Sequence, residues 1–133
     1  MSKIIQMKSD SGENLYPKYL EQYSTLEQKV GIWASGDPIY RKVIDVGTLP
    51  NGTTKSVSTG LNITSVTPIF LSGYALKTTG EYACMPLPFT TDTNPVYVGY
   101  TSTNNIWNIK ITTSSNRSSF NGYIVLEYIK TTN

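Results

Sequence analysis

Histidine is absent from this chain of 133 residues, and cysteine occurs once, as Cys84. Without histidine there is no Ser-His-Asp triad and no imidazole general base. A single cysteine forms neither a cysteine-rich zinc site nor an intramolecular disulfide. Cys84 lies among apolar residues in the run EYACMPLP. We expect it to be a small buried side chain rather than a reactive thiol, because no histidine is present to activate it.

Charge is also sparse. The net charge is +2, and the 11 basic residues are scattered along the chain. They form no stripe that could neutralise a phosphate backbone, so a nucleic-acid partner is not expected. The 9 acidic residues are equally dispersed, and no phosphate-binding loop, nucleophile elbow or metal-ligand cluster is visible. We therefore expect no enzyme, no cofactor and no metal site. A pair of carboxylates meeting in space, as in a glycoside hydrolase, is the distant alternative.

Long apolar runs are missing as well. The first residues, MSKIIQMKSDSGEN, hold only the pair Ile4-Ile5, which is far too short for a secretory signal or a membrane span. From this we expect synthesis in the cytoplasm of a cell and no membrane partner.

Helical periodicity is confined to one short segment near the N-terminus. Its apolar residues follow one another at spacings of four, three and four: Tyr19, Tyr23, Leu26 and Val30. This pattern predicts a short helix or helical turn. Ser24 and Glu27 match the pattern of a capping box, which would instead start a single turn at Thr25. We assign residues 1–29 to an N-terminal arm with this helical segment, serving attachment or trimerisation.

After Val30 the sequence is typical of short antiparallel strands. Thr, Ser, Asn, Val, Ile and Tyr dominate, and clusters of Gly, Pro and Asn separate the apolar or alternating runs. The predicted strands cover residues 39–46, 55–61, 66–76, 82–87, 96–101, 106–113 and 122–130. An all-β fold follows, with an antiparallel, jelly-roll-like β-sandwich over residues 30–133.

Three of these strands allow their faces to be assigned. The turn cluster Ala34-Ser35-Gly36-Asp37-Pro38 predicts a hairpin that leads into the strand 39–46. On that strand Tyr40, Ile44 and Val46 share a face, and on 106–113 Trp107, Ile109 and Ile111 share the core face. Trp33, beside the turn, is expected to pack against the domain. The strand 122–130 is apolar on both faces, which predicts a central strand or one buried against another subunit.

Aromatic and polar residues near the loops suggest a sugar-binding surface. The chain has 10 tyrosines and 2 tryptophans set among Asn, Asp and Thr, and an aromatic ring stacks well on the apolar face of a pyranose. The candidate ligand-binding residues are Tyr82, Asp92, Asn94, Tyr97, Asn104 and Asn105. Ordinary solvated loops are the alternative interpretation. If strands 96–101 and 106–113 form a hairpin, loops 90–96 and 102–105 lie at opposite ends of it. A site would then use one loop alone, or one loop from each of two neighbouring chains.

Three segments carry a resemblance to a known family. They are YSTLEQKVGIW at 23–33, GDPIYRK at 36–42 and GYIVLEYIKTT at 122–132. Together they resemble tail-fibre and receptor-binding proteins of tailed bacteriophages, although Ala34-Ser35 replaces the Ile-Asp that this family often carries. The resemblance implies a homotrimer in the virion tail or baseplate, in contact with other virion proteins. It also implies a host cell-surface saccharide as ligand. The alternative is a structural virion component, such as an accessory baseplate or head-fibre protein, that binds no glycan.

Overall fold

The computed structural model describes residues 7–8, 14–15, 23–77, 79–91 and 93–131. Within these residues the chain forms strands and connections and no α-helix, so the all-β prediction is confirmed. The strands are β1 (Met7–Lys8), β2 (Asn14–Leu15), β3 (Gln28–Ile32), β4 (Pro38–Thr48), β5 (Thr54–Asn62), β6 (Val66–Lys77), β7 (Ala83–Leu87), β8 (Val96–Thr103), β9 (Ile106–Thr113) and β10 (Phe120–Lys130).

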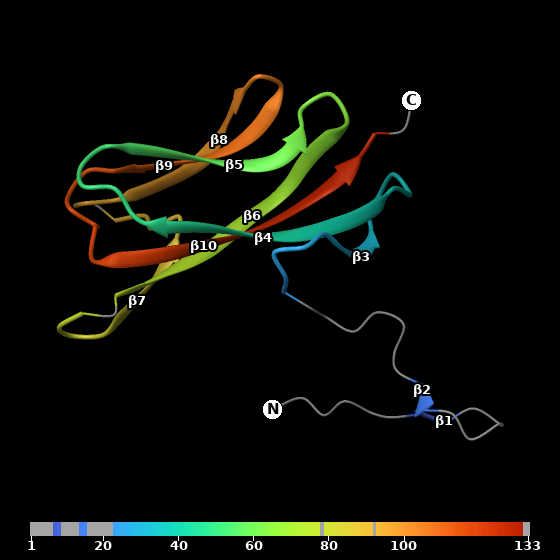
Figure 1. Cartoon of the computed structure of the whole chain (residues 1–133), viewed down its shortest axis with the longest axis horizontal. Helices are drawn as coiled ribbons and strands as arrows, with labels where there is room; N and C mark the ends of the chain where they lie inside the picture. Colours follow the sequence, from blue (N-terminus) through green and yellow to red (C-terminus); the bar gives the residue numbers. More distant parts are fainter. Residues whose placement is uncertain (1–6, 9–13, 16–22, 78, 92, 132–133) are drawn as a thin grey trace.

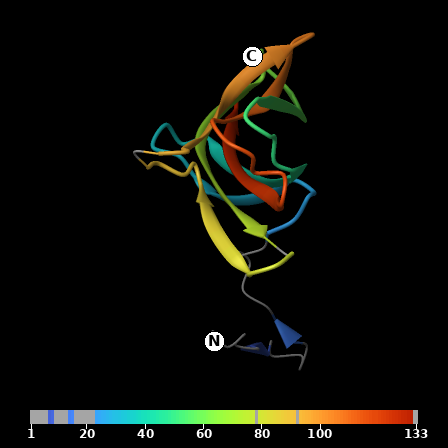
Figure 2. The ribbon, with the colours of Figure 1, turned by 90° about the vertical axis from the view of Figure 1, so that its left-hand side faces the viewer.

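Two antiparallel sheets pack together as a β-sandwich, as the sequence predicts (Figure 1). The larger sheet has the order β3-β4-β10-β6-β7, and the smaller has the order β5-β9-β8. The chain passes from one sheet to the other after β4, β5, β7 and β9. Figure 2 views the sandwich from the end where the β4–β5, β6–β7 and β9–β10 connections lie. The short strands β1 and β2 form a separate antiparallel pair.

Strand β10 is central in the larger sheet, with β4 on one side and β6 on the other. Its residues Ile124, Leu126 and Tyr128 face the interior and are 0% exposed. Tyr123, on the opposite face, is 38% exposed. The predicted central position of this strand is confirmed.

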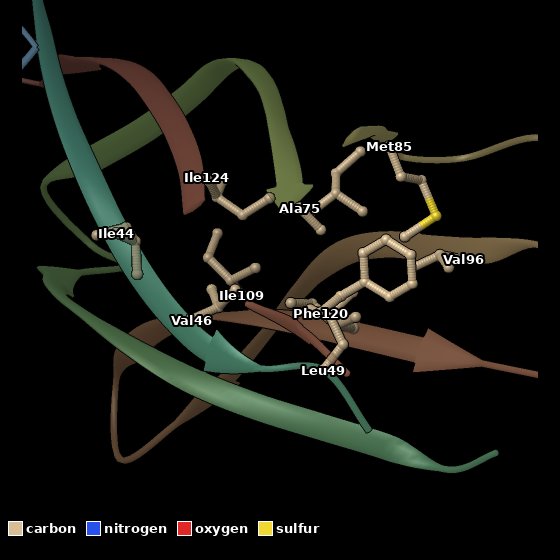
Figure 3. Close-up of a cluster of buried hydrophobic side chains, with 11 residues drawn as sticks. Ile44, Val46, Leu49, Ala75, Met85, Val96, Ile109, Phe120 and Ile124 are labelled. Atoms are coloured by element: carbon tan, nitrogen blue, oxygen red, sulfur yellow. The ribbon is translucent and has the colours of Figure 1, made fainter. Parts of the chain in front are cut away.

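The main core lies between the sheets (Figure 3). Ile109 and Ile111 of β9 are 0% exposed and belong to the same cluster as Ile44 and Val46 of β4. Strands β6, β7, β8 and β10 and the β4–β5 loop contribute the other buried members, which are Leu49, Ala75, Met85, Leu87, Val96, Phe120 and Ile124. Burial of these apolar side chains is the main force that holds the two sheets together.

A second cluster surrounds Tyr128 and Val66. The ring of Tyr40 stacks on Tyr128 with centroids 6.0 Å apart, and the indole Nε1 of Trp107 donates to the Val66 carbonyl at 2.9 Å. Trp107 is partly buried, and Tyr100 packs edge-on against it at 5.9 Å. Burial raises the pKa of Tyr100 to about 12. Tyr40 lies on the inner face with Ile44 and Val46, as the predicted face requires, and the core orientation predicted for Trp107 is confirmed.

Two predictions about burial are wrong. Trp33 is 43% exposed instead of packed. Cys84 is exposed because it lies on the outer face of the edge strand β7, paired with Leu76 of β6. In a strand, side chains alternate between faces, and on β7 it is Met85 and Leu87 that enter the core.

The helical segment is also wrong from Tyr23 onward, while Tyr19 lies outside the described residues. Residues 23–27 are irregular with a bend, and β3 begins at Gln28. The hydroxyl of Ser24 accepts a hydrogen bond from the Leu26 amide at 3.0 Å, and its carbonyl accepts one from Val43 at 2.8 Å. Short helical patterns are marginal in isolation, so these contacts with β4 prevail over the local periodicity.

The predicted hairpin between β3 and β4 is confirmed. The two strands are antiparallel neighbours, and the Trp33 amide donates to the Asp37 carbonyl at 2.8 Å across the turn. Gly36 closes the turn with φ +92°, donating from its amide to the Trp33 carbonyl at 2.8 Å.

Two lysines bridge the sheets between β4 and β5. Lys42 of β4 donates from Nζ to the carbonyl of Thr59 on β5 at 2.9 Å. Lys55 of β5 donates in the other direction, to the carbonyls of Val46 at 2.6 Å and Thr48 at 2.9 Å. Each ammonium group thus satisfies backbone acceptors of the opposite sheet.

A glycine stands beside each of these ammonium groups. Gly47 has φ +67°, and a Cβ built there would lie 3.4 Å from Nζ of Lys55. Gly60 has φ +75°, and its Cβ would lie 3.6 Å from Nζ of Lys42. Glycine accommodates the left-handed backbone and leaves room for the lysine head at both positions.

Candidate functional site

The outer face of the larger sheet carries an unusual density of exposed apolar side chains. Residues that are paired across neighbouring strands lie on the same face of a sheet. Phe70 is 52% exposed, Tyr74 45%, Leu76 39% and Tyr123 38%. We call this surface, over β4, β6 and β10, the aromatic face. It is made of Tyr23, Val43, Phe70, Tyr74, Leu76, Tyr123 and Val125.

A hollow of about 390 Å³ lies in the aromatic face. Tyr23, Val43, Tyr74, Tyr123 and Val125 line it. Tyr74 and Tyr123 are direct cross-strand neighbours, with ring centroids 5.8 Å apart and planes tilted by 30°. Tyr23 is held over β4 by the backbone contact between the neighbouring Ser24 and that strand. The hollow is therefore built by strands far apart in the sequence.

Two of the three charged side chains that border this hollow neutralise each other, while the third, Asp45, is exposed beside its cross-strand partner Tyr123. Arg41 donates from Nε at 2.9 Å and from Nη2 at 2.8 Å to the same oxygen, Oε2, of Glu127. The guanidinium also lies over the ring of Tyr23, 4.5 Å from its centroid. The two charged side chains are only 12% and 20% exposed. An ion pair satisfied in this way leaves an apolar surface without net charge at that point.

The asparagines Asn104 and Asn105 form the two-residue turn of the β8–β9 hairpin. Their φ angles are 51° and 64°, and the flanking residues Thr103 and Ile106 pair with each other. Two positive φ angles in a two-residue loop are the signature of a type I′ turn, where asparagine is favoured for its backbone. The Asn105 carbonyl also accepts from the Ile63 amide at 2.9 Å. Strands β8 and β9 therefore do form a hairpin, and these residues have a structural role in its turn.

The remaining candidate residues lie elsewhere. Tyr97 is on β8, 60% exposed, and Tyr82 lies just before β7, 77% exposed. Asn94 precedes β8 with φ 58°, and its carbonyl accepts from Nη2 of Arg117 at 2.6 Å. Asp92 lies outside the described residues. Asn94 and Tyr97 are thus at one end of the β8–β9 hairpin, and the asparagine turn is at the other, as expected.

The aromatic face was not among the residues singled out from the sequence. A signal for it exists in the alternation on β10, where Tyr123 and Val125 oppose the buried residues. A second signal is the same alternation on β6, where Phe70, Tyr74 and Leu76 are an even number of residues apart. What the sequence does not show is the register that brings Tyr74 beside Tyr123.

Comparison with protein-family models, with curated proteins and with solved structures finds no match. Over the residues that the structure describes, no group of three or more His, Cys, Asp or Glu side chains is placed to hold a metal ion. Those same residues include no helix long and apolar enough to cross a membrane.

Proposed function

We propose that this chain is a component of a tailed-bacteriophage virion, a tail-fibre or receptor-binding module that acts as a homotrimer and recognises host cell-surface glycans. The resemblance of the segments at 23–33, 36–42 and 122–132 supports the class of protein. The observation that carries the proposal is the aromatic face, a contiguous exposed apolar surface on a sheet whose other side is already the core.

The chemistry of the aromatic face suits association with identical copies. Large exposed apolar patches on soluble domains mark interaction sites, because their burial removes apolar surface from water. Arg41 and Glu127 already neutralise each other within one chain. Neither has to find a partner when the face is covered, so this ion pair adds no uncompensated charge to the contact. The carboxylate of Asp45, beside Tyr123, is exposed on the same face. The aromatic face is therefore the expected contact between subunits.

Glycan recognition would use the surfaces left open in such an assembly. Exposed tyrosines, among them Tyr82 and Tyr97, provide flat rings for stacking on pyranoses. Individual contacts of this kind are weak, and three copies on one particle strengthen them through avidity on a repeating polymer.

Light scattering coupled to size exclusion tests the assembly. The wild-type protein should have about three times the chain mass of 14.7 kDa. Val125→Lys, which places a charge in the hollow, should produce a folded monomer, because a charged group in the hollow opposes burial of the aromatic face. Ser56→Lys adds the same charge to the exposed outer side of β5, in the other sheet, and should remain trimeric. A wild-type monomer at micromolar concentration contradicts the proposal.

An array of bacterial cell-surface polysaccharides tests glycan recognition. Retention of the trimer on at least one polysaccharide, without its cleavage, is the expected result. A trimer that binds no polysaccharide on the array would instead favour the non-binding structural virion component.

A further inference from the structure

The outer face of the smaller sheet has a chemistry opposite to that of the aromatic face. It carries hydroxyl groups, one amide, one exposed aromatic ring and one ammonium group. We call it the hydroxyl face; its residues are Thr54, Ser56 and Ser58 on β5, Asn108, Lys110 and Thr112 on β9, and Tyr97, Thr101 and Thr103 on β8. Strands β5, β8 and β9 contain no Asp or Glu at all. We infer that the hydroxyl face binds an anionic saccharide, with Tyr97 stacking on a sugar ring and Lys110 pairing with an acidic group. This inference rests on the proposed glycan-binding function and specifies its ligand class.

Tyr97 is positioned as a stacking platform. It lies on the edge strand β8 and is 60% exposed, although a cross-strand neighbour, Thr112, stands directly opposite. The next residue on the same face is Gly99, and a Cβ built there would meet nothing within 4 Å. The space beside the ring is therefore open along the strand, and a flat ligand can lie against it.

Lys110 stands at the far side of that open space. It pairs with Gly99 across the strands, so it is the diagonal neighbour of Tyr97. Diagonal neighbours in an antiparallel sheet are separated by about 7–8 Å, so a ligand stacked on the ring of Tyr97 lies near the side chain of Lys110. Lys110 is exposed and forms no salt bridge within the described part of the chain. An acidic substituent on the stacked sugar would be within reach of its ammonium group.

The hydroxyl groups around this pair are held in place. The Oγ1 atoms of Thr54 and Thr112 are 3.0 Å apart and share a hydrogen bond. The amide of Asn108, which is 8% exposed, donates to Oγ1 of Thr103 at 2.9 Å. Hydroxyls held by the strands of a sheet give sugar hydroxyls both donors and acceptors without ordering a loop. Lys55, the other lysine of this sheet, is committed to backbone carbonyls between the sheets. Lys110 is therefore the cation that the face presents.

Two sources of negative charge fit this chemistry, a uronate carboxylate and a sugar or polyol phosphate. Binding of the intact protein is measured by biolayer interferometry against three immobilised polymers. These are polygalacturonate, its fully methyl-esterified form and a glycerol-phosphate polymer. We expect binding to one or both anionic polymers, weakening as salt is raised, and little binding to the neutral ester. The preference between the two anionic polymers identifies the source.

Variants then locate the site. Tyr97→Ala and Lys110→Gln should each weaken binding by about tenfold or more, whereas Tyr97→Phe, which keeps the ring, should bind like the wild type. Trp33→Ala and Lys29→Gln remove an exposed ring and an exposed charge from β3 and its turn, in the other sheet, and should change nothing. Thermal melts of all variants verify that the fold is intact.

Each other result overturns the inference in a distinct way. Equal binding of the neutral ester refutes the anionic ligand but leaves glycan recognition standing. Binding that survives both Tyr97→Ala and Lys110→Gln places the site elsewhere. Absence of binding to both anionic polymers refutes the ligand class. The trimer mass and the polysaccharide array decide the proposed function separately.

Discussion

Tyr128 offers a sharp test of how residues 23–32 are attached to the sandwich. Its ring is 0% exposed, and its hydroxyl donates to Oε1 of Glu27 at 2.6 Å. The other carboxylate oxygen accepts from Nζ of Lys130 at 2.8 Å. Tyr128→Phe removes one buried donor and leaves the packing of the ring unchanged, so its effect reports on this hydrogen bond.

The magnitude follows from the surroundings of the two partners. A hydrogen bond to a charged group contributes about 1.5–3 kcal/mol. The side chain of Glu27 is 34% exposed, so water replaces part of the lost bond. We therefore expect Tyr128→Phe to lower the free energy of unfolding by about 1–2 kcal/mol. For a domain of this size the corresponding fall in Tm is roughly 4–7 °C. Lys130→Met, which removes an ion pair with 41% and 34% exposed partners, should cost at most about 1 kcal/mol.

Urea unfolding at one fixed protein concentration measures both changes, because the stability of an oligomer depends on concentration. Glu27→Gln completes a double-mutant cycle with Tyr128→Phe, and we expect the two losses to be less than additive. The reasoning would be refuted if Tyr128→Phe lowered the free energy of unfolding by less than about 0.5 kcal/mol. It would also be refuted if Lys130→Met lowered it by more than Tyr128→Phe does.

Two further predictions concern the same corner of the molecule. Tyr40→Ala removes a partly buried ring that stacks on Tyr128 at 6.0 Å and lies under Nζ of Lys130 at 4.4 Å, and should cost about 3 kcal/mol in urea unfolding. A loss under about 1 kcal/mol would mean that the ring contributes little to the second cluster. Burial, the largest single influence, opposes ionisation of Glu27, but hydrogen bonds from Lys130 and Tyr128 outweigh it and hold the pKa of the carboxyl below its usual value of 4.5. The stability that Glu27 contributes is therefore complete above pH 4.5 and is lost as the pH falls through the lower pKa of the folded state. Glu27→Gln should flatten this part of a plot of unfolding free energy against pH. An unchanged plot would contradict this.

The strands of the sandwich were predictable because their signals are local. Trp107, Ile109 and Ile111 alternate along β9, and this period of two places them on one face wherever the strand pairs. The observed end of a strand differs from the predicted one where a side chain outside the predicted segment is buried in the core. β10 begins at Phe120, two residues before the predicted start at Gly122, because Phe120 is buried in the main cluster.

The errors arise where tertiary contacts decide. Glu27 fits a helical capping pattern, but its carboxylate is taken by Tyr128 and Lys130 of β10. The apolar residues around Cys84 do not show which face of β7 is buried. Because side chains alternate, an error of one residue in this assignment places an exposed side chain such as Cys84 in the core.

The candidate site was predictable only in part, for a related reason. Tyr97 and Tyr82 could be identified as exposed from their positions at loops and strand edges. The pairing of Tyr74 with Tyr123, and of Gly99 with Lys110, depends on the register between strands. Register is a property of the folded sheet and of its turns, and it cannot be read from either strand by itself.

The reciprocal contacts of Lys42 and Lys55 have a consequence for crowded assemblies. Open strand edges recruit strands from other molecules, and copies held together on one particle meet at high local concentration. Carbonyls of Val46, Thr48 and Thr59 are capped by ammonium groups from within the same chain. A foreign strand would have to displace a charged donor before it could pair along this side of the sandwich. This part of the β4–β5 side is thereby protected against β-strand exchange between neighbouring copies.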